Sequence, residues 1–321
     1  MRRLSVVALP LALTAGSTPV TAQWPPERFE NLRVLPDTIP QRELIDLMAG
    51  FTRALGVRCS HCHMGEEGAP LSTYDFPNDE KPTKRKAREM LRMVQAINGQ
   101  HLAGLDDRAD PPVRVQCATC HGGRTTPRQL EDLLLLAYQT GGLDSTLAAY
   151  RTLREEYYGR AAYDFGSVPL TTVAADVRRS SLADATALLA LNVEMNPNSA
   201  FAKREHGRSA IWLAFRDQGV EAGNTRYRAL REAYGQAAFP EFNLNDLGYA
   251  LLRTGKPAEA IAVFELNVDA FPQSANTHDS LGEAYAAAGD IPRAIASYEK
   301  SLELNPRNAN AEAKLKELKG R

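Results

Sequence analysis

Two short stretches of the chain carry the same arrangement of residues that bind metals and cofactors. Residues 59–63 read C-S-H-C-H and residues 117–121 read C-A-T-C-H, so each stretch has two cysteines three positions apart and a histidine directly after the second. The chain has four cysteines, and all of them lie in these two stretches. Thiols and imidazoles at this spacing serve disulfides, zinc sites, redox-active thiols and covalent haem attachment.

Covalent haem attachment is the interpretation that uses all three residues of each motif. Cysteines three positions apart on a helix are about one turn from each other, which lets both sulfurs form thioethers with the vinyl groups of one haem. The next residue, a histidine, then reaches the iron from the same side. The sequence therefore predicts two covalently bound haem c groups, attached through Cys59, Cys62, Cys117 and Cys120, with His63 and His121 as iron ligands.

The other interpretations leave part of the pattern unexplained. Two disulfides are usual in an exported chain with four cysteines, but they give no role to either histidine. Zinc ribbons separate their Cys-x-x-Cys pairs by about 15–20 residues, whereas 54 residues separate the pairs here. A thioredoxin-like redox pair requires a strand–turn–helix context, which surrounds neither motif.

A cytochrome with six-coordinate iron needs a second ligand for each haem, commonly a methionine thioether. Residues 41–55 have the apolar spacing of an amphipathic helix that ends at Gly56, with Thr38 and Gln41 spaced as a capping box. Met48 lies inside the apolar face of this helix. We therefore expect Met48 to be a distal ligand, although a methionine on an apolar stripe also serves as ordinary core filler.

A second amphipathic helix is expected from about Pro82 to just before Asn98-Gly99. Met90 lies near the centre of its apolar arc and Met93 at one edge, so the geometry favours Met90 as the second distal ligand. Met93 is the reserve candidate, and His101 is a more distant one. The basic run of this segment, which includes Lys81, Lys84, Arg85, Lys86 and Arg88, is typical of a solvated helix face.

These stretches together resemble the photosynthetic reaction-centre cytochrome c subunit family. The resemblance is carried by F-E-N-L-R-V-L-P, L-M-A-G-F-T-R-A-L-G-V-R-C-S-H-C-H, K-P-T-K-R-K-A-R-E-M-L-R-M-V-Q-A-I-N and V-Q-C-A-T-C-H-G-G. In that family a helix bearing the distal methionine precedes each motif, which implies that Met48 pairs with His63 and Met90 with His121. Family members bind four haems, whereas this chain has two motifs, and Gly122 stands where the family has arginine.

The C-terminal half repeats with a period of 34 residues, which is the tetratricopeptide period. The clearest units are residues 241–274 and 275–308, with small residues that let paired helices approach and aromatic residues that fill the gap. Upstream, Y-R-T-L-R-E-E-Y-Y-G at Tyr150 matches Y-R-A-L-R-E-A-Y-G at Tyr227, and L-N-V-E at Leu191 matches L-N-V-D at Leu266. We expect four to five degenerate repeats, followed by a cap helix.

The N-terminus and the overall charge limit where the protein acts and what it binds. Residues 1–22 have two arginines, a short apolar stretch and small residues up to Ala22, which is typical of a signal peptide. The apolar stretch is too short to span a bilayer comfortably, so we expect an exported protein, periplasmic or extracellular, without a membrane span in the mature chain. The net charge of −1 argues against nucleic-acid binding.

The sequence thus predicts an all-α protein with a two-haem cytochrome c domain at residues 23–128 and a tetratricopeptide-like helical solenoid at residues 129–321. We expect it to transfer single electrons to or from a redox protein, and to bind a peptide or protein through the solenoid. Catalysis is not expected. The alternative is a haem enzyme or gas sensor, peroxidase-like, in which the distal ligand of one haem can be displaced. A third interpretation makes the chain mainly a repeat scaffold.

Overall fold

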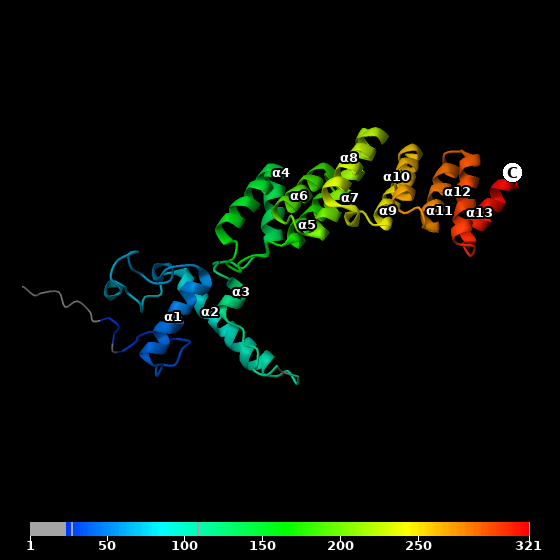
Figure 1. Ribbon diagram of the computed structural model, residues 1–321. Helices are drawn as coiled ribbons and strands as arrows, with labels where there is room; N and C mark the ends of the chain where they lie inside the picture. Colours follow the sequence, from blue (N-terminus) through cyan, green and yellow to red (C-terminus); the bar gives the residue numbers. More distant parts are fainter. Residues whose placement is uncertain (1–23, 27, 108, 321) are drawn as a thin grey trace, which may run out of the picture. The chain divides into compact units, whose positions relative to one another are not determined.

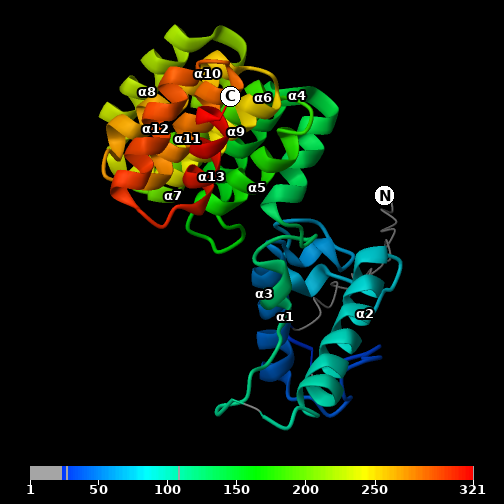
Figure 2. The same ribbon diagram turned by 90° about the vertical axis from the view of Figure 1, so that its right-hand side faces the viewer.

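The computed structural model describes residues 24–26, 28–107 and 109–320. The predicted signal peptide, residues 1–22, lies outside these residues. Within the described chain the regular structure is helical, without a strand, which confirms the predicted all-α class. The chain divides into two compact units with the boundary between Pro127 and Arg128 (Figures 1 and 2).

In its described residues, the N-terminal unit contains three α-helices joined by long connections. They are α1 (Gln41–Leu55), α2 (Pro82–Ala96) and α3 (Cys117–His121). Short 3₁₀ turns occur at Cys59–His61 and Leu71–Thr73, and α2 continues as a π-helical segment over Ile97–Leu102. The short helix α3 packs against both α1 and α2 (Figure 2).

Helix α1 has the predicted bounds but not the predicted N-terminal cap. Its N-cap is Pro40, without a side-chain cap, so the predicted capping box is wrong. The Gln41 amide instead donates to the carbonyl of Pro26 at 3.0 Å. At the other end Gly56 adopts a left-handed conformation (φ 67°), and a Cβ there would lie 2.2 Å from the carbonyl oxygen of Gly123. Glycine therefore ends α1 both by its backbone freedom and by its lack of a side chain.

The C-terminal unit is built from consecutive helical hairpins. Its helices are α4 (Leu130–Tyr157), α5 (Ser167–Val177), α6 (Leu182–Met195), α7 (Ala200–Gln218), α8 (Val220–Tyr234), α9 (Glu241–Arg253), α10 (Pro257–Ala270), α11 (Ala275–Ala287), α12 (Ile291–Leu304) and α13 (Ala309–Lys319). The first helices of successive hairpins, α5, α7, α9 and α11, contact one another in a row (Figure 1). Helix α13 is the predicted cap helix.

Close helix packing in the two clearest repeats depends on one glycine and one aromatic ring in each. A Cβ on Gly248 would lie 2.4 Å from the ring of Phe264, and one on Gly282 would lie 3.0 Å from the ring of Tyr298. Real Cβ atoms essentially never approach other atoms to 2.4 Å, so a larger residue at position 248 would force Phe264 or its helix to move. At position 282 the contact would be tight, and Tyr298 would have to move by a few tenths of an ångström. The small and aromatic residues therefore have the packing role that the 34-residue period predicts.

A buried polar side chain closes three of the hairpins. Asn192 donates to the carbonyl of Ser167 at 2.8 Å, and Asn267 donates to that of Glu241 at 3.2 Å. Ser301 donates to the carbonyl of Ala275 at 2.8 Å. In each case a residue near the end of the second helix bonds to the first residue of the first helix, because α5, α9 and α11 begin at these acceptors.

The apolar core of the C-terminal unit consists of two clusters, one over α4–α6 and one over α7–α13. Tyr150 and Tyr227 begin the two matching sequence stretches described above. Both are fully buried, one in each cluster. Helix α4 is kinked at Gly142, whose φ of 69° is not helical. Across the described residues, no helix is long and apolar enough to cross a membrane.

Candidate haem-binding site

The first motif forms one tight turn that is fixed by the start of α2. The backbone N–H groups of Cys62 and His63 both donate to the carbonyl of Cys59, at 3.2 and 3.0 Å. The hydroxyl of Thr83 donates to the carbonyl of His61 at 2.5 Å, and the Lys81 ammonium donates to that of Ser60. Two residues at the N-terminal end of α2 therefore hold the turn that carries Cys59, Cys62 and His63.

The second motif is the helix α3, and the segment after α2 positions it. Asn98 exchanges two hydrogen bonds with the backbone of Val115, both of 2.8 Å, just before the motif starts. The backbone N–H of Gln116 donates to the hydroxyl oxygen of Thr119 at 3.0 Å, which supports the first turn of α3. Gly122, left-handed at φ 52°, ends the helix directly after His121.

A backbone hydrogen bond links the segment after the second motif to the helix before the first motif. The N–H of Gly123 donates to the carbonyl of Ala54 at 2.9 Å, so the residue two positions after the second motif is bonded to the last turn of α1. Helix α1 leads into the first motif through Gly56, which lies against Gly123. Both motifs are therefore attached to one backbone frame.

The side chain of His63 lies in an aromatic environment. Its ring meets Phe76 edge to face with centroids 4.8 Å apart, and Phe76 stacks on Trp24 at 4.6 Å. The Nδ1 atom of His63 is buried without a hydrogen-bond partner. Burial, and then the positive charge of Lys84, lower the pKa of His63 to about 4. The imidazole is therefore neutral at pH 7, the form that binds a metal.

The side chain of His121 is oriented by its own loop. Its Nδ1 lies 2.8 Å from the carbonyl oxygen of Arg124. Because a carbonyl only accepts, Nδ1 must carry the proton, which leaves the lone pair of Nε2 available to a metal. A second hydrogen bond of this kind, on the nitrogen that does not bind the metal, is the usual way in which proteins orient a histidine ligand.

A buried lysine organises the loop that carries Phe76. Lys84 is 8% exposed, and its ammonium donates to the carbonyls of Phe76, Pro77 and Asn78 at 2.7, 3.0 and 2.7 Å. It also pairs with the Asp79 carboxylate at 2.9 Å. The basic run of this segment predicts a solvated helix face, which is wrong for Lys84.

Arg88 is a second exception to that prediction, because it pairs with Asp79 at 2.7 Å and donates to the carbonyl of Asn31 at 2.9 Å. Hydrogen bonds from Arg88, and then from Asn31 and Lys84, hold the pKa of the Asp79 carboxyl well below its usual range. In the sequence, the presence of Asp79 just before α2 is the one indication that Lys84 and Arg88 could be paired.

The methionines proposed as distal ligands differ in their exposure. Met48 is half-buried in α1, the helix that leads into the first motif. Met90 and Met93 lie on α2, which packs against α3, and are 41% and 44% exposed. His101, the most distant candidate, is exposed in the π-helical segment. Which sulfur would reach which iron therefore remains a prediction.

The residues around the two motifs fit a haem. No disulfide joins the four motif cysteines, and burial raises the pKa of Cys62 and of Cys117. Among the described residues before Arg128, the buried apolar side chains are Leu44 and Ala54 alone, so the protein itself supplies little core there. Exposed thioethers such as that of Met90 are the kind of surface that the apolar faces of a porphyrin cover.

Comparison with known proteins supports this interpretation for the N-terminal part. Residues 17–133 match the family described as photosynthetic reaction centre cytochrome C subunit. A segment of 78 residues, 24% of this chain, is 38% identical to cytochrome c-554 of Chloroflexus aurantiacus. That segment spans only 16% of the length of cytochrome c-554. The family implies covalently bound haem c.

The C-terminal part has its own relatives. Residues 275–308, which are the second unit of the predicted repeat, match the tetratricopeptide repeat family. A crystal structure of MamA protein is similar over 56% of this chain and 92% of its own, with 20% identity and a TM-score of 0.32. YrrB, a tetratricopeptide protein described as having an unusual peptide-binding site, is similar over 58% and 90%, with 14% identity and a TM-score of 0.31.

The chain therefore combines a cytochrome c-like domain, which matches the photosynthetic reaction centre cytochrome C subunit family over residues 17–133, with a segment at residues 275–308 that matches the tetratricopeptide repeat family.

Proposed function

We propose that this protein is an exported c-type cytochrome that binds two haem c groups and transfers single electrons. Cys59 and Cys62 would hold one haem and Cys117 and Cys120 the other, with His63 and His121 as proximal iron ligands. Met48 and Met90 would complete the two coordination spheres, with Met93 as the reserve for Met90. The observation that carries the proposal is that two Cys-x-x-Cys-His turns are attached to one backbone frame through Ala54 and Gly123.

When bound, haem c supplies a one-electron couple. The residues of the chain have the tasks of attachment, orientation and exclusion of water. The Arg124 carbonyl fixes the tautomer of His121, and Phe76 covers one edge of the His63 ring. Ligation by imidazole and thioether would leave the iron without an open position and would raise its potential, which favours electron transfer over catalysis at the metal.

Haem number and ligation are tested on the purified, exported protein. Its intact mass should exceed that of the mature polypeptide by two haem groups, and replacing both Cys117 and Cys120 by serine should remove one of them. Met48→Ala and Met90→Ala should each convert one haem to a form that binds carbon monoxide, whereas Met93→Ala should not. A mass with fewer than two haems, or an unchanged spectrum in Met48→Ala, would refute this assignment.

The alternative function is that of a haem enzyme or gas sensor. It requires that an external ligand can replace the distal thioether at one iron. The two functions are separated by adding carbon monoxide to the unaltered reduced protein. Prompt binding at one haem supports the sensor or enzyme, and absence of binding supports electron transfer.

The proposal also gives the C-terminal unit a docking role. Tetratricopeptide repeats form protein-interaction domains, and stacked hairpins offer a continuous surface to a partner. Electron transfer from a chemical donor should then be independent of this unit, whereas electron transfer from the protein partner should require it. A partner that reduces the chain equally fast after deletion of residues 128–321 would contradict the docking role.

A further inference from the structure

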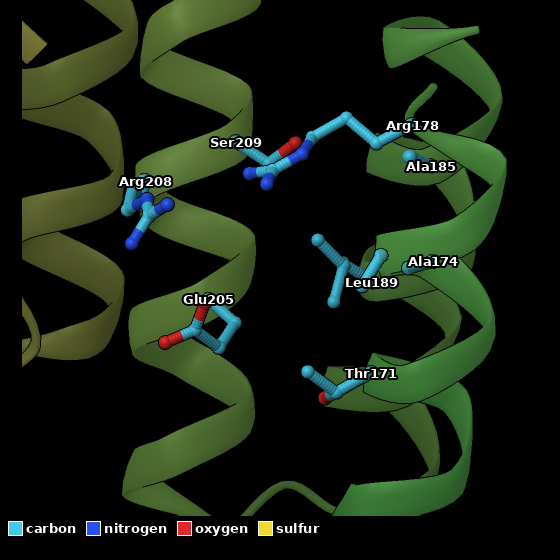
Figure 3. Close-up of a pocket in the computed structure, with 9 residues that line it drawn as sticks. Thr171, Ala174, Arg178, Ala185, Leu189, Glu205, Arg208 and Ser209 are labelled. Carbon is cyan, nitrogen blue, oxygen red and sulfur yellow. The ribbon is translucent and has the colours of Figure 1, made fainter. Parts of the chain in front are cut away.

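A small pocket in the C-terminal unit lies between the first two hairpins, outside the haem sites. Its walls come from α5, α6 and α7, and its volume is about 100 Å³ (Figure 3). Drug-sized ligands and cofactors generally occupy 300–1,000 Å³. The pocket is therefore large enough for one side chain of a partner, and too small for most free cofactors.

The floor of the pocket is apolar and its hydroxyl groups are already bonded. Ala174, Ala185 and Leu189 supply aliphatic surface. The hydroxyl of Thr171 donates to the carbonyl of Ser167 at 2.8 Å, and that of Ser209 lies 2.8 Å from the hydroxyl of Thr186. These groups offer little to a new polar ligand, so the charged side chains of the walls decide what the pocket binds.

The walls carry more positive than negative charge. Arg178 at the end of α5 and Arg208 on α7 both line the pocket, and neither guanidinium group has an ion pair or hydrogen bond with another described residue. In Figure 3 the Arg178 side chain extends from α5 toward Ser209 of α7. The one carboxylate in the wall, Glu205, is paired with Arg204 at 3.4 Å. Two guanidinium groups are thus left for an anion.

We propose that this pocket binds the carboxylate of a glutamate side chain in an acidic segment of the partner protein. The carboxylate would accept hydrogen bonds from Arg178 and Arg208, which supply planar, permanently charged donors, while its aliphatic stem lies on Leu189 and Ala174. Arg208 is half-buried, so an anion would also compensate a charge that the protein leaves without a counterion. This inference deepens the proposed docking role and rests on it.

The test uses the full-length, haem-loaded protein and an acetylated peptide of alternating glutamate and alanine, followed by ligand-observed NMR up to millimolar concentration. An otherwise identical peptide with glutamine in place of glutamate is the comparison. We expect only the glutamate peptide to bind. Replacing both arginines, Arg178→Gln with Arg208→Gln, should weaken binding at least tenfold, and Arg178→Lys with Arg208→Lys should retain part of it.

Arg179→Gln is the matched control, because Arg179 is the exposed neighbour of Arg178 and pairs with Asp176. It should change binding less than twofold. Three results would each overturn the proposal that this pocket binds glutamate. They are no binding of the glutamate peptide, equal binding of the glutamine peptide, and weakening by Arg179→Gln as large as that by Arg178→Gln with Arg208→Gln. Haem content and spectrum, measured on the same samples, report on the cytochrome proposal independently, and reduction by the protein partner reports on docking as such.

Discussion

Replacing Lys84 by methionine should destabilise the N-terminal unit by about 3 kcal/mol. The ammonium donates to three carbonyls and one carboxylate in an environment where the residue is only 8% exposed. Removing one partner of a buried, hydrogen-bonded charge generally costs 3–5 kcal/mol, and partial access of water to the freed carbonyls places this site at the lower end. Methionine keeps the length and the apolar stem, so the loss reports on the charge and its hydrogen bonds.

The free energy of unfolding is measured by urea titration of the haem-loaded protein at pH 7, followed by the absorbance of the haem. Lys86→Met is the control, because Lys86 is exposed on the same helix. A loss of about 3 kcal/mol corresponds to a change of roughly a hundredfold in the unfolding equilibrium constant. If Lys84→Met unfolds within about 0.5 kcal/mol of Lys86→Met, the buried ammonium does not organise the 76–79 loop and the reasoning fails.

Three further predictions concern pH and packing. The pKa of the Asp79 carboxyl is held below its usual range, so its stabilising effect is present above about pH 4 and is lost as the pH falls further; Asp79→Asn should flatten the stability curve below pH 4, measured by urea titration from pH 2 to 5. Burial, and then the charge of Arg226, lower the pKa of His206 to about 4. Between pH 6.5 and 4 the unfolded chain therefore binds a proton that the folded chain does not bind. As the pH falls through this window, the free energy of unfolding of the C-terminal unit should decrease by up to about 3 kcal/mol. His206→Phe should remove this pH dependence, and an unchanged slope in far-UV circular dichroism melts would contradict it. Gly248→Ala should destabilise by about 1–3 kcal/mol and Gly282→Ala by less, because the added Cβ would meet its aromatic ring at 2.4 Å in the first case and 3.0 Å in the second; the reverse order of thermal midpoints would refute the packing argument.

Features that depend on periodic spacing could be predicted from the sequence. The bounds of α1 follow from its apolar stripe and Gly56, and the start of α2 follows from Pro82, as the structure shows. The repeat units could be located because their small and aromatic residues recur every 34 positions. The two Cys-x-x-Cys-His motifs are equally local, since their chemistry depends on residues within one turn.

Features that depend on contacts between distant residues could not be predicted. The burial of Lys84 is invisible in a run of basic residues, because it depends on a loop that turns three carbonyls toward the ammonium. The helical path also continues past Asn98-Gly99 to Leu102, beyond the predicted end, and the Asn98 side chain bonds to Val115 there. The predicted capping box is likewise wrong because the Gln41 side chain bonds to the carbonyl of Pro26, which is distant in sequence.

The hydrogen bond from Gly123 to Ala54 has a consequence for the order in which the protein is made. Its donor and acceptor are far apart in sequence, and the acceptor belongs to the helix that leads into the first motif. Because synthesis runs from the N-terminus, the newly made first motif must wait for the second before its support is complete. The N-terminal unit is thus expected to mature late and as a whole, with neither motif acquiring its final backbone surroundings alone.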